Sequence, residues 1–118
     1  MTGDEVRALC LGLPETTEKE TWGDEDNPGH PTFRVRDKIY VIMAVDGSGG
    51  SIRTSMAEQS DLMSAFPDGV RSAAYVGRYG WVDVEFGAVP DEVLREVIES
   101  AWARTAPKKV AAAWRDTR

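Results

Sequence analysis

The spacing of apolar residues predicts three helices. A helix over about residues 3–12 follows a capping box formed by Thr2 and Glu5, in which each side chain accepts a hydrogen bond from the backbone N–H of the other residue. A second helix follows Ser55 and ends before Pro67, and a third runs from about residue 90 to Thr105. Their apolar stripes are Val6, Leu9, Cys10 and Leu13; Leu62, Met63 and Phe66; and Val93, Leu94, Val97, Ile98, Ala101 and Trp102.

Between the helices, period-two alternation predicts strands. Residues 33–43 read as a hairpin that turns near Asp37, and residues 75–86 as a second hairpin with a glycine turn at 77–80. Residues 18–22 are expected to form a polar edge strand and residues 51–54 a further strand. Strands joined largely as hairpins give a mainly antiparallel sheet with helices on one face, so we predict a single α+β domain over residues 1–118.

Charge is distributed unevenly along the 118 residues, which carry a formal net charge of -6. Residues 1–30 hold eight acids against two bases, whereas residues 31–118 hold twelve of each sign. This balance argues against a protein that coats nucleic acid indiscriminately, because Lys and Arg drive such binding, but it permits a local basic face. With no signal peptide and no membrane-spanning apolar segment, we expect a cytoplasmic protein without a membrane partner.

The sequence contains no recognisable catalytic constellation. His30 lies near Asp24, Glu25 and Asp26, but the spacing fits no metal-ligand pattern, and a solvated loop is expected there. The glycines at 47–50 lead into a predicted strand rather than a helix, unlike a phosphate-binding loop. We therefore expect no enzyme activity, no metal and no cofactor.

The second predicted hairpin carries the most suggestive surface chemistry. Arg71, Arg78 and Tyr79 surround its glycine turn, and Trp81 shares a strand face with polar residues. A large aromatic ring beside arginines can stack on a base or a flat ligand while the cations hold phosphate. The alternative is that Trp81 is covered by a helix or the C-terminal tail.

Four segments resemble motifs of the MmcQ/YjbR-like family. Residues 33–40, Phe-Arg-Val-Arg-Asp-Lys-Ile-Tyr, are similar to the family's first hairpin, and residues 75–82, Tyr-Val-Gly-Arg-Tyr-Gly-Trp-Val, to its second. Residues 13–18 resemble the opening stretch, and residues 106–111 the closing motif of an actinobacterial-looking, hence bacterial, branch. The resemblance implies a double-wing fold, in which two β-hairpins project beside a helix.

The same resemblance implies two functions. The family is commonly described as DNA-binding, and the wing positions that would contact phosphate here are Arg34, Arg36, Lys38, Arg78 and Trp81. Members also occur beside antibiotic-biosynthesis genes, which implies instead a protein that binds or sequesters a small molecule.

Three hypotheses therefore stand at the level of sequence. The first is a DNA-binding module that uses the two wings. The second is a protein that binds a small aromatic ligand in a pocket lined by Trp22, Tyr75 and Trp81. The third is a structural or interaction protein that uses exposed edge strands.

Overall fold

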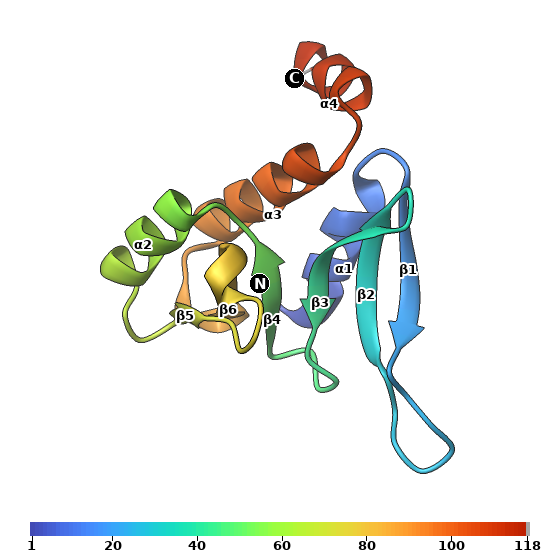
Figure 1. Ribbon diagram of the computed structural model, residues 1–118, viewed down its shortest axis with the longest axis vertical. Coiled ribbons are helices and arrows are strands. Elements are labelled where there is room, and N and C mark those ends of the chain that lie inside the picture. The colour runs from blue at the N-terminus through green and yellow to red at the C-terminus, as the bar shows by residue number, and fades with distance from the viewer. Residues whose placement is uncertain (118) are drawn as a thin grey trace.

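The computed structural model describes residues 1–117, which form helices around one sheet (Figure 1). The α-helices are α1 (Gly3–Gly12), α2 (Met56–Ala65), α3 (Asp91–Thr105) and α4 (Lys108–Asp116), with 3-10 turns η1 (Gly77–Tyr79) and η2 (Phe86–Ala88). The strands are β1 (Thr16–Thr21), β2 (His30–Val35), β3 (Lys38–Met43), β4 (Gly49–Arg53), β5 (Val70–Ser72) and β6 (Trp81–Glu85). Within these residues, no helix is long and apolar enough to cross a bilayer.

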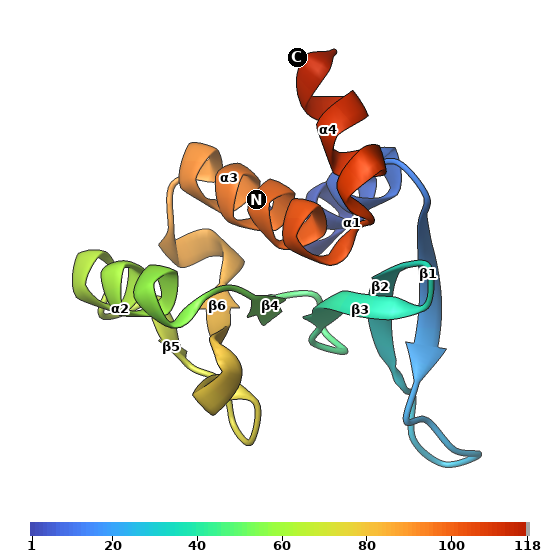
Figure 2. The same ribbon diagram turned by 45° about the horizontal axis from the view of Figure 1, so that its top comes forward.

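The six strands of this part of the chain form a single antiparallel sheet in the order β1-β2-β3-β4-β6-β5. Figure 2 shows α1 and α3 on the same side of it. The core lies between them and the sheet, where a row of register partners, Phe33, Val41, Ile52 and Val82, is completely buried. The predicted α+β class and the antiparallel sheet are confirmed.

Local sequence explains the first hairpin. Val35 pairs with Lys38, so the turn between them contains only Arg36 and Asp37, which both adopt positive φ (49° and 65°) as a type I′ turn requires. The register then shifts between Phe33 and Arg34, which leaves Tyr40 as the extra residue of a bulge. The bulge allows two consecutive residues, Tyr40 and Val41, to be buried together. The Tyr40 hydroxyl forms a hydrogen bond of 2.8 Å with Thr16 Oγ1.

The second hairpin differs from its prediction. Its first arm is β5, Val70–Ser72, whereas Tyr75 and Val76 lie in the connection that leads to η1. Tyr75 has a left-handed φ of 63° and Val76 a helical ψ of -4°, so neither can continue an extended strand. The predicted arm was wrong because apolar Tyr75-Val76 resembles a strand although Tyr75 is exposed.

Residues 108–116, for which the sequence pattern predicts no helix, form α4. The third helix ends at Thr105 as predicted, and Pro107 is the N-cap residue of α4, because proline is well suited to the start of a helix. The rings of Trp114 in α4 and Trp102 in α3 pack edge to face, with centroids 5.1 Å apart. The helix count is therefore four α-helices in residues 1–117 rather than about three.

Cys10 is expected to be inert in the folded protein. Its side chain is completely buried in α1, and burial raises the pKa of the thiol to about 12. At pH 8 the reagent cannot reach the buried thiol, and the thiol is not ionised. An aromatic disulfide reagent should therefore leave the native protein unlabelled but label the urea-unfolded chain fully. Comparable labelling rates in the two states would contradict this placement.

Candidate functional site

The sheet face opposite α1 and α3 remains open and carries mainly polar residues. One register row crosses it from β2 to β5 and consists of Thr32, Ile42, Ser51, Asp83 and Arg71. Figure 2 shows two connections, residues 22–29 and 73–80, projecting from the sheet on the side away from α1 and α3. The open face and these two connections form the candidate site.

A concavity of about 320 Å³ lies on this open face. Five strands contribute to its lining, with His30 from β2, Ile42 from β3, Ser51 from β4, Asp83 from β6 and Arg71 from β5. The Ser51 hydroxyl donates to Asp83 Oδ1 at 2.5 Å, so this carboxylate is held in a fixed position. The concavity is small, shallow and lined by both donors and acceptors.

The arginines of the open face lack carboxylate partners among residues 1–117. Arg34 is half-buried and donates to two hydroxyls, Thr32 Oγ1 at 3.1 Å and Thr21 Oγ1 at 3.0 Å. Arg71 and Arg78 are exposed, and neither forms an ion pair in the part of the chain described. Neutral partners orient Arg34 without cancelling its charge, which suits it to an anionic ligand.

Arg36, by contrast, already has an anionic partner. Its Nε lies 2.8 Å from Glu15 Oε1 and a second nitrogen lies 3.3 Å from Oε2, a bidentate pair. The hydrogen bond from Arg36 lowers the pKa of Glu15, and the same bond raises the pKa of Arg36. Of the first predicted wing, only Arg34 and the exposed Lys38 are therefore free of a carboxylate among the residues described.

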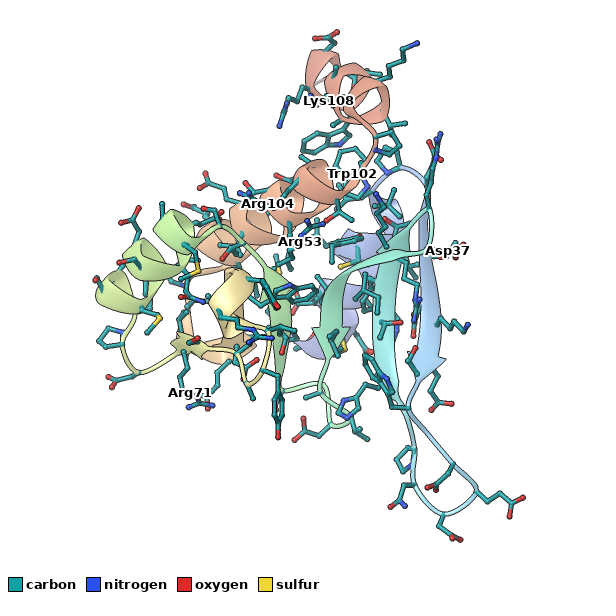
Figure 3. All side chains as sticks on the ribbon, in the orientation of Figure 1. Asp37, Arg53, Arg71, Trp102, Arg104 and Lys108 are labelled. Carbon is teal, nitrogen blue, oxygen red and sulfur yellow. The ribbon has the colours of Figure 1, made fainter. Side chains whose placement is uncertain are left out.

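The two predicted wings stand apart. Arg36 lies in the β2–β3 turn and Lys38 begins β3, whereas Arg78 and Trp81 belong to η1 and β6, and β4 separates β3 from β6 in the sheet. Figure 3 shows the separation, since Asp37 at the turn and Arg71 on β5 lie on opposite sides of the molecule. The cations that share a surface are those of the open face, not those of the first turn.

Exposed aromatic residues mark the two projecting connections. Trp22 is 65% exposed and Tyr75 94% exposed, and both have positive φ, 67° and 63°. Large side chains rarely adopt this backbone region, and such strain gathers at functional sites. Tyr79 is also exposed, with the Arg78 guanidinium 4.9 Å above its ring. Trp81, on the strand itself, is half-buried, and none of Trp22, Tyr75 and Trp81 lines the concavity.

The 22–29 connection is held by its own polar groups. Asp24 Oδ1 accepts from the backbone N–H groups of Asp26 and Asn27 at 2.9 and 2.8 Å, and these bonds lower the pKa of Asp24. His30 follows it, with Nδ1 3.2 Å from the Met43 carbonyl oxygen and its ring edge-on to Trp22, centroids 6.4 Å apart. Residues 22–28 are all exposed, as expected of a solvated loop, and the turn places Trp22 against His30, which lines the concavity.

The 73–80 connection is anchored by α2 and by Thr54, the residue that follows β4. Gln59 is buried, and its Nε2 donates to the carbonyls of Gly77 and Trp81, each at 2.8 Å. The Thr54 backbone N–H donates to the carbonyl of Gly80, where φ is 98° and a side chain would collide with the backbone of Thr54. Held at Gly77 and Gly80, this connection presents Tyr75, Arg78 and Tyr79 to solvent.

This arrangement, a sheet covered by helices on one face and framed by two projecting connections on the other, defines a small α+β domain. The family model described as YjbR matches residues 11–104, and the chain belongs to the YjbR family, which confirms the sequence resemblance. The crystal structure of Deinococcus radiodurans protein DR2400, a DUF419 domain, is similar with a TM-score of 0.73 and 23% identity, covering 86% of this chain and 76% of that one. No curated protein matches.

Sequence reasoning missed the set of residues that line the concavity. Asp83 stands out as polar on an alternating strand and Arg71 as a cation near a turn, but Ser51 carries no signal. The three meet only because β4, β6 and β5 are neighbours in that order and in that register. Pairing between distant strands cannot be read from local alternation.

Proposed function

We propose that the protein binds single-stranded nucleic acid across the open face of its sheet. One observation carries the proposal. On one side of the molecule, exposed aromatic residues with strained backbone conformations lie together with arginines that have no carboxylate partner in residues 1–117. Proteins that hold single strands combine a cationic groove for the phosphates with aromatic side chains on which the bases stack. Arg34, Arg71 and Arg78 provide the first, and Trp22 and Tyr75 the second.

The spacing of the cations favours an extended ligand. Arg34 lies on β2 and Arg71 on β5, with three strands between them, which is about 19 Å across the sheet at the usual strand spacing. A single small anion cannot contact both guanidinium groups, whereas a polynucleotide presents phosphates repeatedly along its length.

The carboxylates on the same face support the choice of a single strand over a duplex in this proposal. Asp83 and Glu85 lie between the cations, and they repel phosphates but accept hydrogen bonds from the amino and imino groups of bases. Those groups are available on unpaired bases and largely occupied in a duplex. We therefore expect single strands to bind more tightly than duplexes of the same sequence.

A fluorescence-anisotropy titration over a range of salt concentrations tests the proposal. Affinity for a mixed-sequence single strand should fall steeply with salt, and Arg34→Gln should weaken binding about tenfold and reduce the salt slope by about 0.7. Glutamine can still bond to Thr21 and Thr32, so the fold should be retained. Arg95→Gln, which removes an exposed charge from α3, is the matched control and should leave the affinity unchanged.

Two results would overturn the proposal. The first is an absence of binding at low salt to either DNA or RNA single strands. The second is an equal loss from Arg34→Gln and Arg95→Gln, because that would indicate a response to net charge and not to the open face.

A further inference from the structure

The donors and acceptors of the concavity are arranged for a particular kind of base. Arg71 and Asp83 are direct register partners on neighbouring strands, yet they form no ion pair among the residues described. Such partners have Cβ atoms about 5 Å apart, so a guanidinium and a carboxylate stand side by side without cancelling each other. Both retain hydrogen-bonding capacity for a ligand.

Ser51 explains why Asp83 stays available. It lies opposite Asp83 on the other neighbouring strand and donates to Oδ1, which keeps this half-buried carboxylate in place as an acceptor. Glu85, two residues along the same strand face, adds a second carboxylate to the lining and has no ion-pair partner in residues 1–117. The concavity therefore offers one group of donors, Arg71, beside two acceptors.

The rim of the concavity favours a flat ligand. His30 lines it, and the contact of Nδ1 with the Met43 carbonyl oxygen fixes the imidazole ring. Trp22 packs edge-on to that ring and is itself mostly exposed. Half-buried Ile42 adds apolar surface from β3. Aromatic edges and faces beside a polar floor are typical of sites that hold planar heterocycles.

From this geometry we propose that the concavity holds a guanine base, an inference that rests on the proposed binding of a nucleic-acid strand. Guanine presents the acceptor O6 next to two donors, N1–H and the N2 amino group, and it is the common base with two adjacent donor groups on its pairing edge. Arginine bonds O6, the usual arginine contact to guanine, and the carboxylates of Asp83 and Glu85 accept from the donors. Adenine and cytosine each offer one amino donor there, and uracil one imino donor.

The test compares, by anisotropy, single strands of equal length that each contain one guanine, adenine, cytosine or thymine in an abasic background. The guanine strand should bind about tenfold more tightly than the others. Asp83→Asn should abolish that preference, because the amide NH₂ group would face the donors of guanine. The amide oxygen can still accept the hydrogen bond from Ser51. Asp61→Asn, which removes an exposed acid from α2, is the matched control and should preserve the preference.

A second arm separates the base from the strand. Free GMP, but not AMP, should displace the guanine strand from the wild-type protein. GMP should also quench the tryptophan fluorescence of the wild-type protein but not that of Asp83→Asn. Equal affinity for the four strands, or a guanine preference unchanged in Asp83→Asn, would overturn this inference and leave strand binding intact. Loss of all strand binding together with GMP binding that depends on Asp83 would instead remove the proposed function and retain the guanine site.

Discussion

Replacing Trp102 with alanine is expected to lower the free energy of unfolding by about 3–5 kcal/mol, a large share of the stability of a domain this size. Trp102 is completely buried, and its Nε1–H donates to the Pro14 carbonyl at 2.9 Å, which ties α3 to the connection between α1 and β1. Trp102 lies near the end of α3 that leads to α4 (Figure 3), and its ring packs against that of Trp114 in α4. Alanine would leave a cavity and remove the partner of the half-buried Pro14 carbonyl. Urea unfolding followed by circular dichroism measures the loss.

Two further variants show whether the effect comes from this position. Trp102→Phe keeps most of the apolar volume but lacks the indole N–H, so it should cost about 1–2 kcal/mol. Trp114→Ala removes the half-buried partner ring on α4 and should cost less than Trp102→Ala. If Trp102→Ala and Trp114→Ala destabilise the protein equally, Trp102 is not the anchor that the structure indicates.

The elements that are predicted well from sequence are those that bury one face. In α3, five members of the predicted apolar stripe are buried, namely Leu94, Val97, Ile98, Ala101 and Trp102. Burial imposes the helical or strand period on the sequence, so the period reveals the element. The two-residue turn near Asp37 was likewise predictable from the alternation on either side of it.

The predictions failed where apolar residues are exposed. Tyr75 reads as part of a strand, yet it is 94% exposed in a left-handed conformation, and the strand that pairs with β6 lies earlier in the chain. Solvent-facing aromatic residues carry no period because no core selects their spacing. A mismatch between local pattern and structure of this kind is expected at functional sites.

The acidic N-terminal segment takes on a structural meaning that charge counting could not supply. Arg7 pairs with Asp4 and Glu18, and Arg36 pairs with Glu15. These acids of residues 1–30 thus pair with cations at α1 and at the β2–β3 turn, away from the sheet arginines. A net charge of -6 is therefore compatible with arginines on the open face that have no carboxylate partner within residues 1–117.

The double variant Trp22→Ala with Tyr75→Ala is expected to weaken single-strand binding by about 2 kcal/mol or more, roughly thirtyfold, because each stacked base contributes about 1–3 kcal/mol. Both rings are largely exposed, at strained backbone positions, and contribute little to the packing of the core. The melting temperature should therefore stay within a few degrees of the wild-type value. Anisotropy titration at one fixed salt concentration gives the affinity, and thermal denaturation gives the stability.

Leu11→Ala is the matched control, since Leu11 is an exposed apolar residue, 46% exposed, on α1. Its affinity should equal that of the wild type, because α1 lies on the opposite side of the sheet. The salt slope of the double variant should also remain near that of the wild type, since stacking involves no phosphate charge. Full affinity in the double variant would show that the two aromatic residues do not contribute to binding. The backbone strain at Trp22 and Tyr75 would then have a cause other than base stacking.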